Sequence, residues 1–195
     1  MIVLASKSPT RSALLTGAGV AFETALPGVD EDAVKVEMLA TGATPREVAA
    51  ALAERKALRV SASRPGLIIG ADQTLEFEGG LYDKVDTIDA ARERLALLRG
   101  KAHELHAAVV VAKDGLAIWR DLVTVRLMMR DFSDVFLEHY LSTEGPHALG
   151  SVGCYRLEGP GAQLFSRIDG DYFAILGLPM LGLLDLLRRE GALVR

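Results

Sequence analysis

Asp72 is the side chain whose position in the sequence most favours catalysis. It follows the continuous apolar run at residues 67–71, which is typical of a strand that is buried on both faces. A carboxylate at the carboxyl end of such a strand lies where α/β sheets usually bind ligands. Asp72 could hold a divalent metal ion or accept a proton from water, and the alternative is an exposed turn residue.

The segment from Ser6 to Arg11 has the composition of an anion-binding loop. A short apolar run leads into it, and Ser8 followed by Pro9 predicts the start of a helix. Free backbone N–H groups at a helix N-terminus favour an anion, and the Ser6 and Ser8 hydroxyls add donors. Arg11, in the first turn, could contact a phosphate through two N–H groups. An ordinary capped helix with solvated basic residues is the other interpretation.

Further charged residues would complete a site for a triphosphate. An acidic run at residues 30–32, which includes Glu31, lies in a predicted loop, and its oxygens suit the hard cation that accompanies a triphosphate. Lys56 lies beside the apolar stripe of a helix that starts with a capping box, and Lys84 follows a predicted hairpin. Each of these is more often a solvated surface group, but the lysines and Arg11 could converge on one polyanion.

Other chemistries find little support in the sequence. His103 and His106 lie three residues apart on a predicted strand, so they point to opposite faces and are poor candidates for a shared metal. The single cysteine, Cys154, is better interpreted as a small packed residue than as a reactive thiol. The sequence contains no P-loop, G-x-S-x-G, H-E-x-x-H or Cys/His zinc motif.

Strands and helices are interleaved along the chain. Apolar runs and alternating patterns predict strands at residues 2–5, 67–71, 104–112, 116–129 and 162–168, and a hairpin at residues 75–82 around Gly79-Gly80. Capping signals predict helices after Ser8, Thr44, Thr87, Ser133 and Pro179. This order favours the α/β class with a mixed sheet. Since no repeat, low-complexity segment or linker is present, we expect one domain over residues 1–195, with two lobes around a cleft as a plausible arrangement.

The composition restricts the partners that this chain can have. Its 195 residues are 50% hydrophobic and 25% charged, which is typical of a folded globular protein. The formal net charge of −4 gives no general attraction to nucleic acid or to an anionic membrane. The apolar run at the N-terminus is too short for a signal peptide, and no run approaches the ~20 residues of a membrane helix. We expect a cytoplasmic protein, since its lone cysteine also suits a reducing compartment.

Taken in order, these segments resemble the Maf family of nucleotide pyrophosphatases, from residue 4 almost to the C-terminus. No single segment is specific, but the ordered set is. The matching segments are Leu4-Ala5-Ser6-x-Ser8-Pro9-x-Arg11, Val29-Asp30-Glu31, Leu52-Ala53-x-x-Lys56-Ala57, Gly70-Ala71-Asp72 with Lys84, Asp89-Ala90, Leu95, Leu98, Gly100, His103, Gly170 and Gly177-Leu178-Pro179.

The resemblance implies an α/β fold with an elongated mixed sheet in two lobes and a nucleotide-binding cleft between them, often in a homodimer. It implies hydrolysis of nucleoside triphosphates between the α and β phosphates, giving a monophosphate and pyrophosphate. Such a house-cleaning enzyme keeps unwanted nucleotides out of nucleic acids. Asp72 would be the catalytic acid/base and would share a divalent cation (Mg²⁺, Mn²⁺ or Co²⁺) with Glu31. Phosphate contacts would come from Ser6, Ser8, Arg11, Lys56 and Lys84.

Some positions depart from the usual family pattern. Thr10 and Ser12 flank Arg11, where the family often has a second arginine, and Val85 follows Lys84 where proline is common. The segment at residues 150–159 also differs from the family's usual form.

Two residues bear on the base of the substrate. Gln73 and Glu158 resemble the subgroup that acts on 7-methyl-GTP, in which a carboxylate could accept hydrogen bonds from the guanine N1–H and N2 amine. The aromatic residue expected near Thr10 in that subgroup is absent, so dTTP and UTP, or a broad range, stay open. A non-catalytic nucleotide-binding regulator is a further alternative, because the family has been linked to septum inhibition and cell-division arrest.

Overall fold

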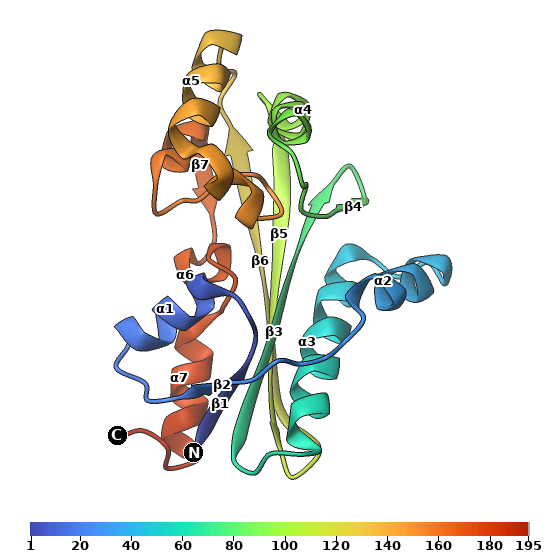
Figure 1. Ribbon diagram of the computed structural model, residues 1–195, viewed down its shortest axis with the longest axis vertical. Coiled ribbons are helices and arrows are strands. Elements are labelled where there is room, and N and C mark those ends of the chain that lie inside the picture. Colours follow the sequence, from blue (N-terminus) through green and yellow to red (C-terminus); the bar gives the residue numbers. More distant parts are fainter. Residues whose placement is uncertain (195) are drawn as a thin grey trace.

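The computed structural model describes residues 1–194, and a seven-stranded mixed sheet forms its centre (Figure 1). The strands run in the order β2-β1-β3-β5-β6-β7, and β4 pairs with β3. Their bounds are β1 (Ile2–Ala5), β2 (Glu23–Thr24), β3 (Leu67–Phe77), β4 (Gly80–Tyr82), β5 (Ala102–Lys113), β6 (Leu116–Met129) and β7 (Phe165–Asp169). The α/β class and the mixed sheet predicted from the sequence are therefore confirmed.

The helices begin where their capping residues predict. The side chains of Ser8, Thr44, Thr87 and Ser133 each accept a hydrogen bond from a backbone N–H of the first turn. The helices are α1 (Pro9–Gly17), α2 (Glu31–Ala40), α3 (Pro45–Ser61), α4 (Ile88–Leu98), α5 (Asp134–Glu144), α6 (Tyr172–Ile175) and α7 (Met180–Arg189), with 3₁₀ turns at Gly145–Gly150 and Pro160–Leu164. Helix α3 covers one face of the sheet, and α1 and α7 cover the other (Figure 1).

The sheet is parallel at one edge and antiparallel elsewhere. Strand β1 is parallel to β2 and β3, whereas β4, β5, β6 and β7 pair antiparallel with their neighbours. Ala5, the last residue of β1, pairs with Gly70 of β3. The chain of β1 therefore leaves the sheet just before the level of Asp72.

Three expectations from the sequence need correction. The acidic run at residues 30–32 is not a loop, because Asp30 caps α2 and the next two residues form its first turn. Asp72 does not end its strand, since β3 continues to Phe77; it lies instead beyond the carboxyl end of the parallel neighbour β1. The last predicted strand starts later, at Phe165, after a 3₁₀ turn.

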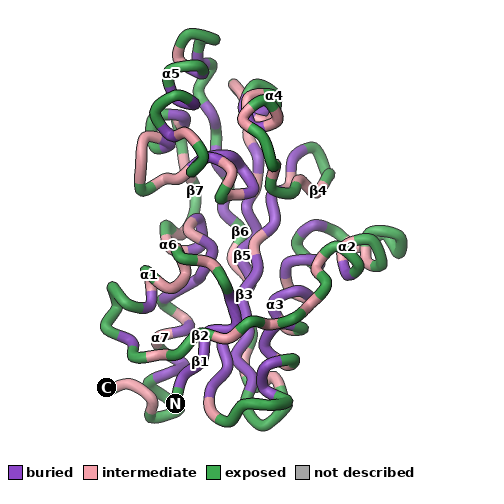
Figure 2. Tube along the Cα trace, in the orientation of Figure 1, coloured by how far each residue is buried: buried purple, intermediate pink, exposed green. Residues whose placement is uncertain are grey.

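The buried residues form separate groups along the sheet (Figure 2). At one end, α3 packs its alanines on one face of β1, β3 and β5, and α1 and α7 pack on the other face. A larger group at the other end joins β3, β5 and β6 to α4, α5 and the 3₁₀ turns. No helix among residues 1–194 combines the length and the apolar character that crossing a bilayer requires.

Gly70 permits the close approach of α3 to β3. A Cβ atom at this position would lie 2.3 Å from the carbonyl oxygen of Ala53 and 2.5 Å from the backbone nitrogen of Ala57. Backbone atoms cannot swing aside, so we expect Gly70→Ala to lower the free energy of unfolding by about 1–3 kcal/mol in urea denaturation. Gly17→Ala is the control, because nothing lies within 4 Å of its added Cβ. Equal stability of the two variants would contradict this account of the packing.

Candidate active site

A cavity of about 1080 Å³ opens beside the end of β1, between the two ends of the sheet. Every residue that the sequence predicted for the site lines it. These residues are Ser6, Ser8, Arg11, Glu31, Lys56, Asp72, Gln73, Lys84 and Glu158. Segments far apart in the chain thus contribute to one polar cavity.

Lys56 joins the two carboxylates of the cavity. Its Nζ lies 2.6 Å from Oδ1 of Asp72 and 2.7 Å from Oε1 of Glu31. Lys56 and Asp72 are 4% and 6% exposed, so this pair is shielded from water. The lysine reaches the pair from α3, Asp72 comes from β3, and Glu31 comes from the first turn of α2. The three elements bring two negative charges and one positive charge together.

The two carboxylates differ in their protonation behaviour. Burial raises the pKa of Asp72, although the charges of Lys56 and Arg11 oppose this effect. Burial acts in the same direction on Glu31, but its hydrogen bond to Lys56 and the charge of that lysine outweigh it, so the pKa of Glu31 is lowered. When two neighbouring carboxyl groups have different pKa values, one can exchange a proton while the other stays ionised. Such pairs are typical of sites for acid/base catalysis.

The loop from β1 to α1 presents hydroxyl groups to the cavity. Oγ of Ser6 accepts hydrogen bonds from the Ser8 backbone N–H and from Nη1 of Arg11. Oγ of Ser8 accepts one from the Arg11 backbone N–H. Because these bonds use oxygen lone pairs, each hydroxyl retains its hydrogen for donation to an anion. The N-terminus of α1 contributes its dipole in the same direction.

Arg11 is held by backbone carbonyl groups of two distant segments. Its Nε donates to the Gly177 carbonyl oxygen over 2.8 Å, and its Nη1 donates to that of Ala71 over 2.9 Å. The bidentate phosphate contact expected from the sequence would therefore rely on Nη2 or on the release of one of these bonds. The guanidinium group also fixes the loop before α7 against β3.

The two residues that bear on base recognition, Gln73 and Glu158, differ in how many of their polar atoms are already hydrogen-bonded. Nε2 of Gln73 donates to the carbonyl oxygens of Ala174 and Ile175, which leaves its amide oxygen for a ligand. Glu158 is exposed and lines the cavity, and its carboxylate forms no hydrogen bond within the described chain. Glu158 is thus the freer of the two to accept hydrogen bonds from a bound base.

Sequence reasoning missed two side chains in the cavity wall. Lys35 of α2 lines the cavity and contacts Asp83 over 2.6 Å. The predicted loop at residues 30–32 gives Lys35 no defined position, although an acidic first turn after an Asp cap is a helix-start signal. Tyr155 is buried in the wall, and its hydroxyl lies 2.7 Å from Nε2 of His103. Burial lowers the pKa of His103 to about 4, so this imidazole is neutral.

The donor atoms of the cavity fit a hard divalent cation. Lys56 contacts Oδ1 of Asp72 and Oε1 of Glu31, so the second oxygen of each carboxylate is free of ion pairs within residues 1–194. Mg²⁺ in nucleotide sites is commonly held by one or two carboxylates together with substrate phosphates. A separate group of Glu76, Glu104 and His106, outside this cavity, also has the geometry to hold a metal ion.

The fold and the cavity define an α/β protein with a polar site suited to an anion, and sequence comparisons define its family. A family model described as Maf-like protein matches residues 1–190. The chain belongs to the Maf family.

Relatives across the full length have related names. The chain is 57% identical to a nucleoside triphosphate pyrophosphatase of Caulobacter vibrioides, over 98% of this chain and 96% of that protein. It is 50% identical to a 7-methyl-GTP pyrophosphatase of Brucella abortus, over 97% of this chain and 96% of that protein. It is 45% identical to a 7-methyl-GTP pyrophosphatase of Rhizobium meliloti, over 99% of this chain and 98% of that protein.

Proposed function

We propose that this chain is a nucleoside triphosphate pyrophosphatase that cleaves between the α and β phosphates. The observation that carries the proposal is the pair of carboxylates, Asp72 and Glu31, bridged by buried Lys56 beside the anion-binding start of α1. The relatives named as pyrophosphatases support it, since they match nearly the whole chain.

In this proposal Asp72 accepts a proton from the attacking water. Its raised pKa moves its basicity towards the neutral range, where general-base catalysis is most effective. A divalent cation shared by Glu31 and Asp72 would neutralise charge that develops on the phosphoryl oxygens. The Ser6 and Ser8 hydroxyls, Arg11, Lys56 and Lys84 would bind the phosphates. Positioned donors of this kind stabilise developing negative charge.

The site predicts a bell-shaped dependence of kcat/KM on pH. On the acid side, activity should fall as Asp72 takes up a proton. Because the pKa of Asp72 is raised, this fall should occur above the ordinary aspartate pKa of about 3.9. The pKa of Lys84 is lowered, mainly because burial desolvates its ammonium group and secondly because Arg11 is positively charged. The alkaline limb should therefore begin below the ordinary lysine pKa. Since arginine keeps its charge, Lys84→Arg should move the alkaline limb upward and leave the acid limb in place. An unmoved alkaline limb would exclude Lys84 as its source.

Glu158 is the residue that we propose selects a methylated guanine nucleotide. Its free carboxylate at the cavity could accept hydrogen bonds from guanine N1–H and the N2 amine. A hydrogen bond to a charged group contributes about 1.5–3 kcal/mol, so Glu158→Gln should lower kcat/KM for 7-methyl-GTP by about 10–100-fold. The values for dTTP and UTP should change little. A uniform loss across all nucleotides would instead assign Glu158 to general binding or folding.

The remaining expectations belong to the same proposal. We treat residues 1–195 as one Maf-like domain with two lobes around the nucleotide cleft, because a continuous sheet joins separate buried groups on either side of the cavity. The cytoplasmic location and the homodimer stay predictions. Light scattering on purified protein would test the dimer.

Pyrophosphate release tests the proposed function. The panel contains dTTP, UTP, CTP, GTP and 7-methyl-GTP, each with Mg²⁺, Mn²⁺ or Co²⁺. We expect release from at least one nucleotide and the highest kcat/KM for 7-methyl-GTP. Release from none of them, with a folded protein, would remove the enzyme proposal. A preference for dTTP and UTP would keep the enzyme and reject the assigned base.

A further inference from the structure

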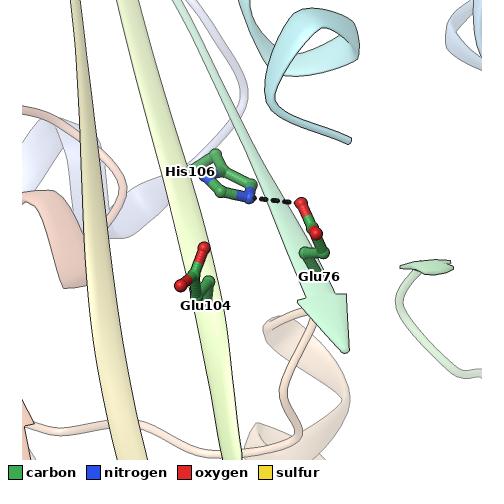
Figure 3. Close-up of side chains that lie close together, drawn as sticks. All are labelled: Glu76, Glu104 and His106. Atoms are coloured by element: carbon green, nitrogen blue, oxygen red, sulfur yellow. Dashed lines mark hydrogen bonds and ion pairs between the residues drawn. The ribbon is translucent and has the colours of Figure 1, made fainter. Parts of the chain in front are cut away.

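Three side chains of types that can bind metal ions lie close together on the sheet (Figure 3), and none of them lines the cavity. Glu76 is on β3, and Glu104 and His106 are on the neighbouring strand β5. In the register of the two strands, Glu104 pairs with Glu76, and His106 pairs with Thr74. The three side chains therefore project from the same face of the sheet.

This face is polar at the level of the three side chains. Thr74 donates a hydrogen bond to the carbonyl oxygen of Pro45, the first residue of α3, so the helix begins at this level of the strand. Beyond it, the large buried group at this end of the molecule takes Leu75 and Leu105 from the opposite face. Beyond the start of α3, this face of β3 and β5 therefore carries an imidazole and two carboxylates rather than large apolar side chains.

The ligand atoms are already close to one another. One atom from each of the three side chains lies within 4.8 Å of the others. In a tetrahedral Zn²⁺ site with metal–ligand bonds of about 2.0–2.2 Å, neighbouring ligand atoms lie about 3.3–3.6 Å apart. Rotation of the two long glutamate side chains would bring the three ligand atoms to this spacing without moving either strand.

His106 is fixed in the orientation of a metal ligand. It is 2% exposed, its Nδ1 lies 2.9 Å from Oγ1 of Thr124, and its Nε2 lies 2.9 Å from Oε2 of Glu76. A hydroxyl can donate or accept, so Thr124 can accept from Nδ1–H when the Nε2 lone pair faces a metal. Such a partner on the second nitrogen is a regular feature of metal-bound histidine.

The negative charges of this group are only partly paired within residues 1–194. His106 contacts Glu76, but Glu104 forms no ion pair or hydrogen bond within residues 1–194. Arg126 lies opposite Glu104 in the β5–β6 register and forms no ion pair with it in this part of the chain. Two carboxylates beside one imidazole leave net negative charge, which a divalent cation would neutralise.

We propose that Glu76, Glu104 and His106 bind a divalent transition-metal ion of the Zn²⁺ class, with water completing the coordination. Imidazole together with carboxylates suits this class, whereas an all-oxygen set suits Mg²⁺ or Ca²⁺. The ion links β3 to β5 four residues along β3 from Asp72, outside the cavity, and stabilises the sheet that carries the cavity. The ion should bind without nucleotide and without turnover, so this proposal can be tested independently of the proposed function.

Metal titration of the full chain tests the site. The protein is freed of metal with a chelator and titrated without nucleotide, with Zn²⁺ in calorimetry and with Co²⁺ in visible absorption. Glu104→Gln is the main variant, because it keeps the shape of the side chain and the Glu104 carboxylate has no hydrogen bond or ion pair within residues 1–194 to lose. Replacing a group that merely supports a ligand costs about 10–100-fold in affinity, so loss of this ligand should weaken Zn²⁺ binding by more than about 100-fold. His106→Asn is the second ligand variant.

Glu31→Gln is the matched control, since it removes one carboxylate of the cavity while Lys56 keeps its 2.6 Å contact with Asp72. We expect it to retain the Zn²⁺ binding and the Co²⁺ absorption that Glu104→Gln loses. The proposal is overturned if the wild-type chain binds neither ion, if Glu104→Gln binds as tightly as wild type, or if the control loses the binding.

Discussion

Replacing Asp72 with asparagine should lower kcat/KM by about 10²–10⁴-fold, the range that a positioned proton-transfer group contributes. Asparagine keeps the shape of the side chain but cannot accept the proton, and it removes a carboxylate oxygen from the metal site. The fold should survive, because Lys56 keeps its 2.7 Å contact with Glu31. Steady-state kinetics on the preferred nucleotide, with circular dichroism to verify folding, measures this effect.

Asp83→Asn is the matched control for this variant. Asp83 also lines the cavity, but its carboxylate pairs with Lys35 and is half exposed. An exposed pair contributes little, about 0–1 kcal/mol, so the control should retain most of the activity. If both variants lose activity equally, the effect comes from the acidity of the cavity as a whole, and the role given to Asp72 is wrong.

Replacing Lys56 with methionine should lower the free energy of unfolding by about 3–5 kcal/mol, the cost of removing one partner from a buried ion pair. Methionine fills a similar length of chain but leaves the carboxylate of Asp72, which is 6% exposed, without its closest cation. Urea denaturation at neutral pH measures this loss. Activity should also fall, because Lys56 lies among the proposed phosphate ligands.

The double variant Lys56→Met with Asp72→Asn separates lost charge pairing from lost packing. With no buried carboxylate left unpaired, it should be more stable than Lys56→Met alone. The coupling energy from the four-variant cycle then reports the pair itself. Strict additivity, or a Lys56→Met variant as stable as the wild type, would show that the Lys56–Asp72 contact contributes nothing to the fold.

The sequence predicted those parts of the fold that local signals specify. The caps at Ser8, Thr44, Thr87 and Ser133 set helix starts because each side chain bonds the backbone within its own first turn. The hairpin between β5 and β6 was also predictable, since Asp114 and Gly115 both adopt positive φ in a tight turn.

Other features depend on contacts that no local pattern contains. The apolar run before Asp72 predicts a strand that ends there, but β3 continues through Thr74 and Glu76 because β5 pairs with it along that length. The bridge from Lys56 to Glu31 and Asp72 joins three elements, so sequence spacing could not predict its geometry. The proximity of Glu76 and Glu104 likewise comes from strand register, which the sequence leaves open.

The central claim is that the cavity around Asp72 cleaves the α–β phosphate bond, and product identification tests it most directly. The preferred nucleotide is turned over by the wild-type chain with a divalent cation, and the products are separated and identified by phosphorus NMR. The account predicts equal amounts of nucleoside monophosphate and pyrophosphate, with neither formed at a comparable rate by Asp72→Asn. Formation of nucleoside diphosphate and phosphate, or no turnover by a folded wild-type chain, would contradict it.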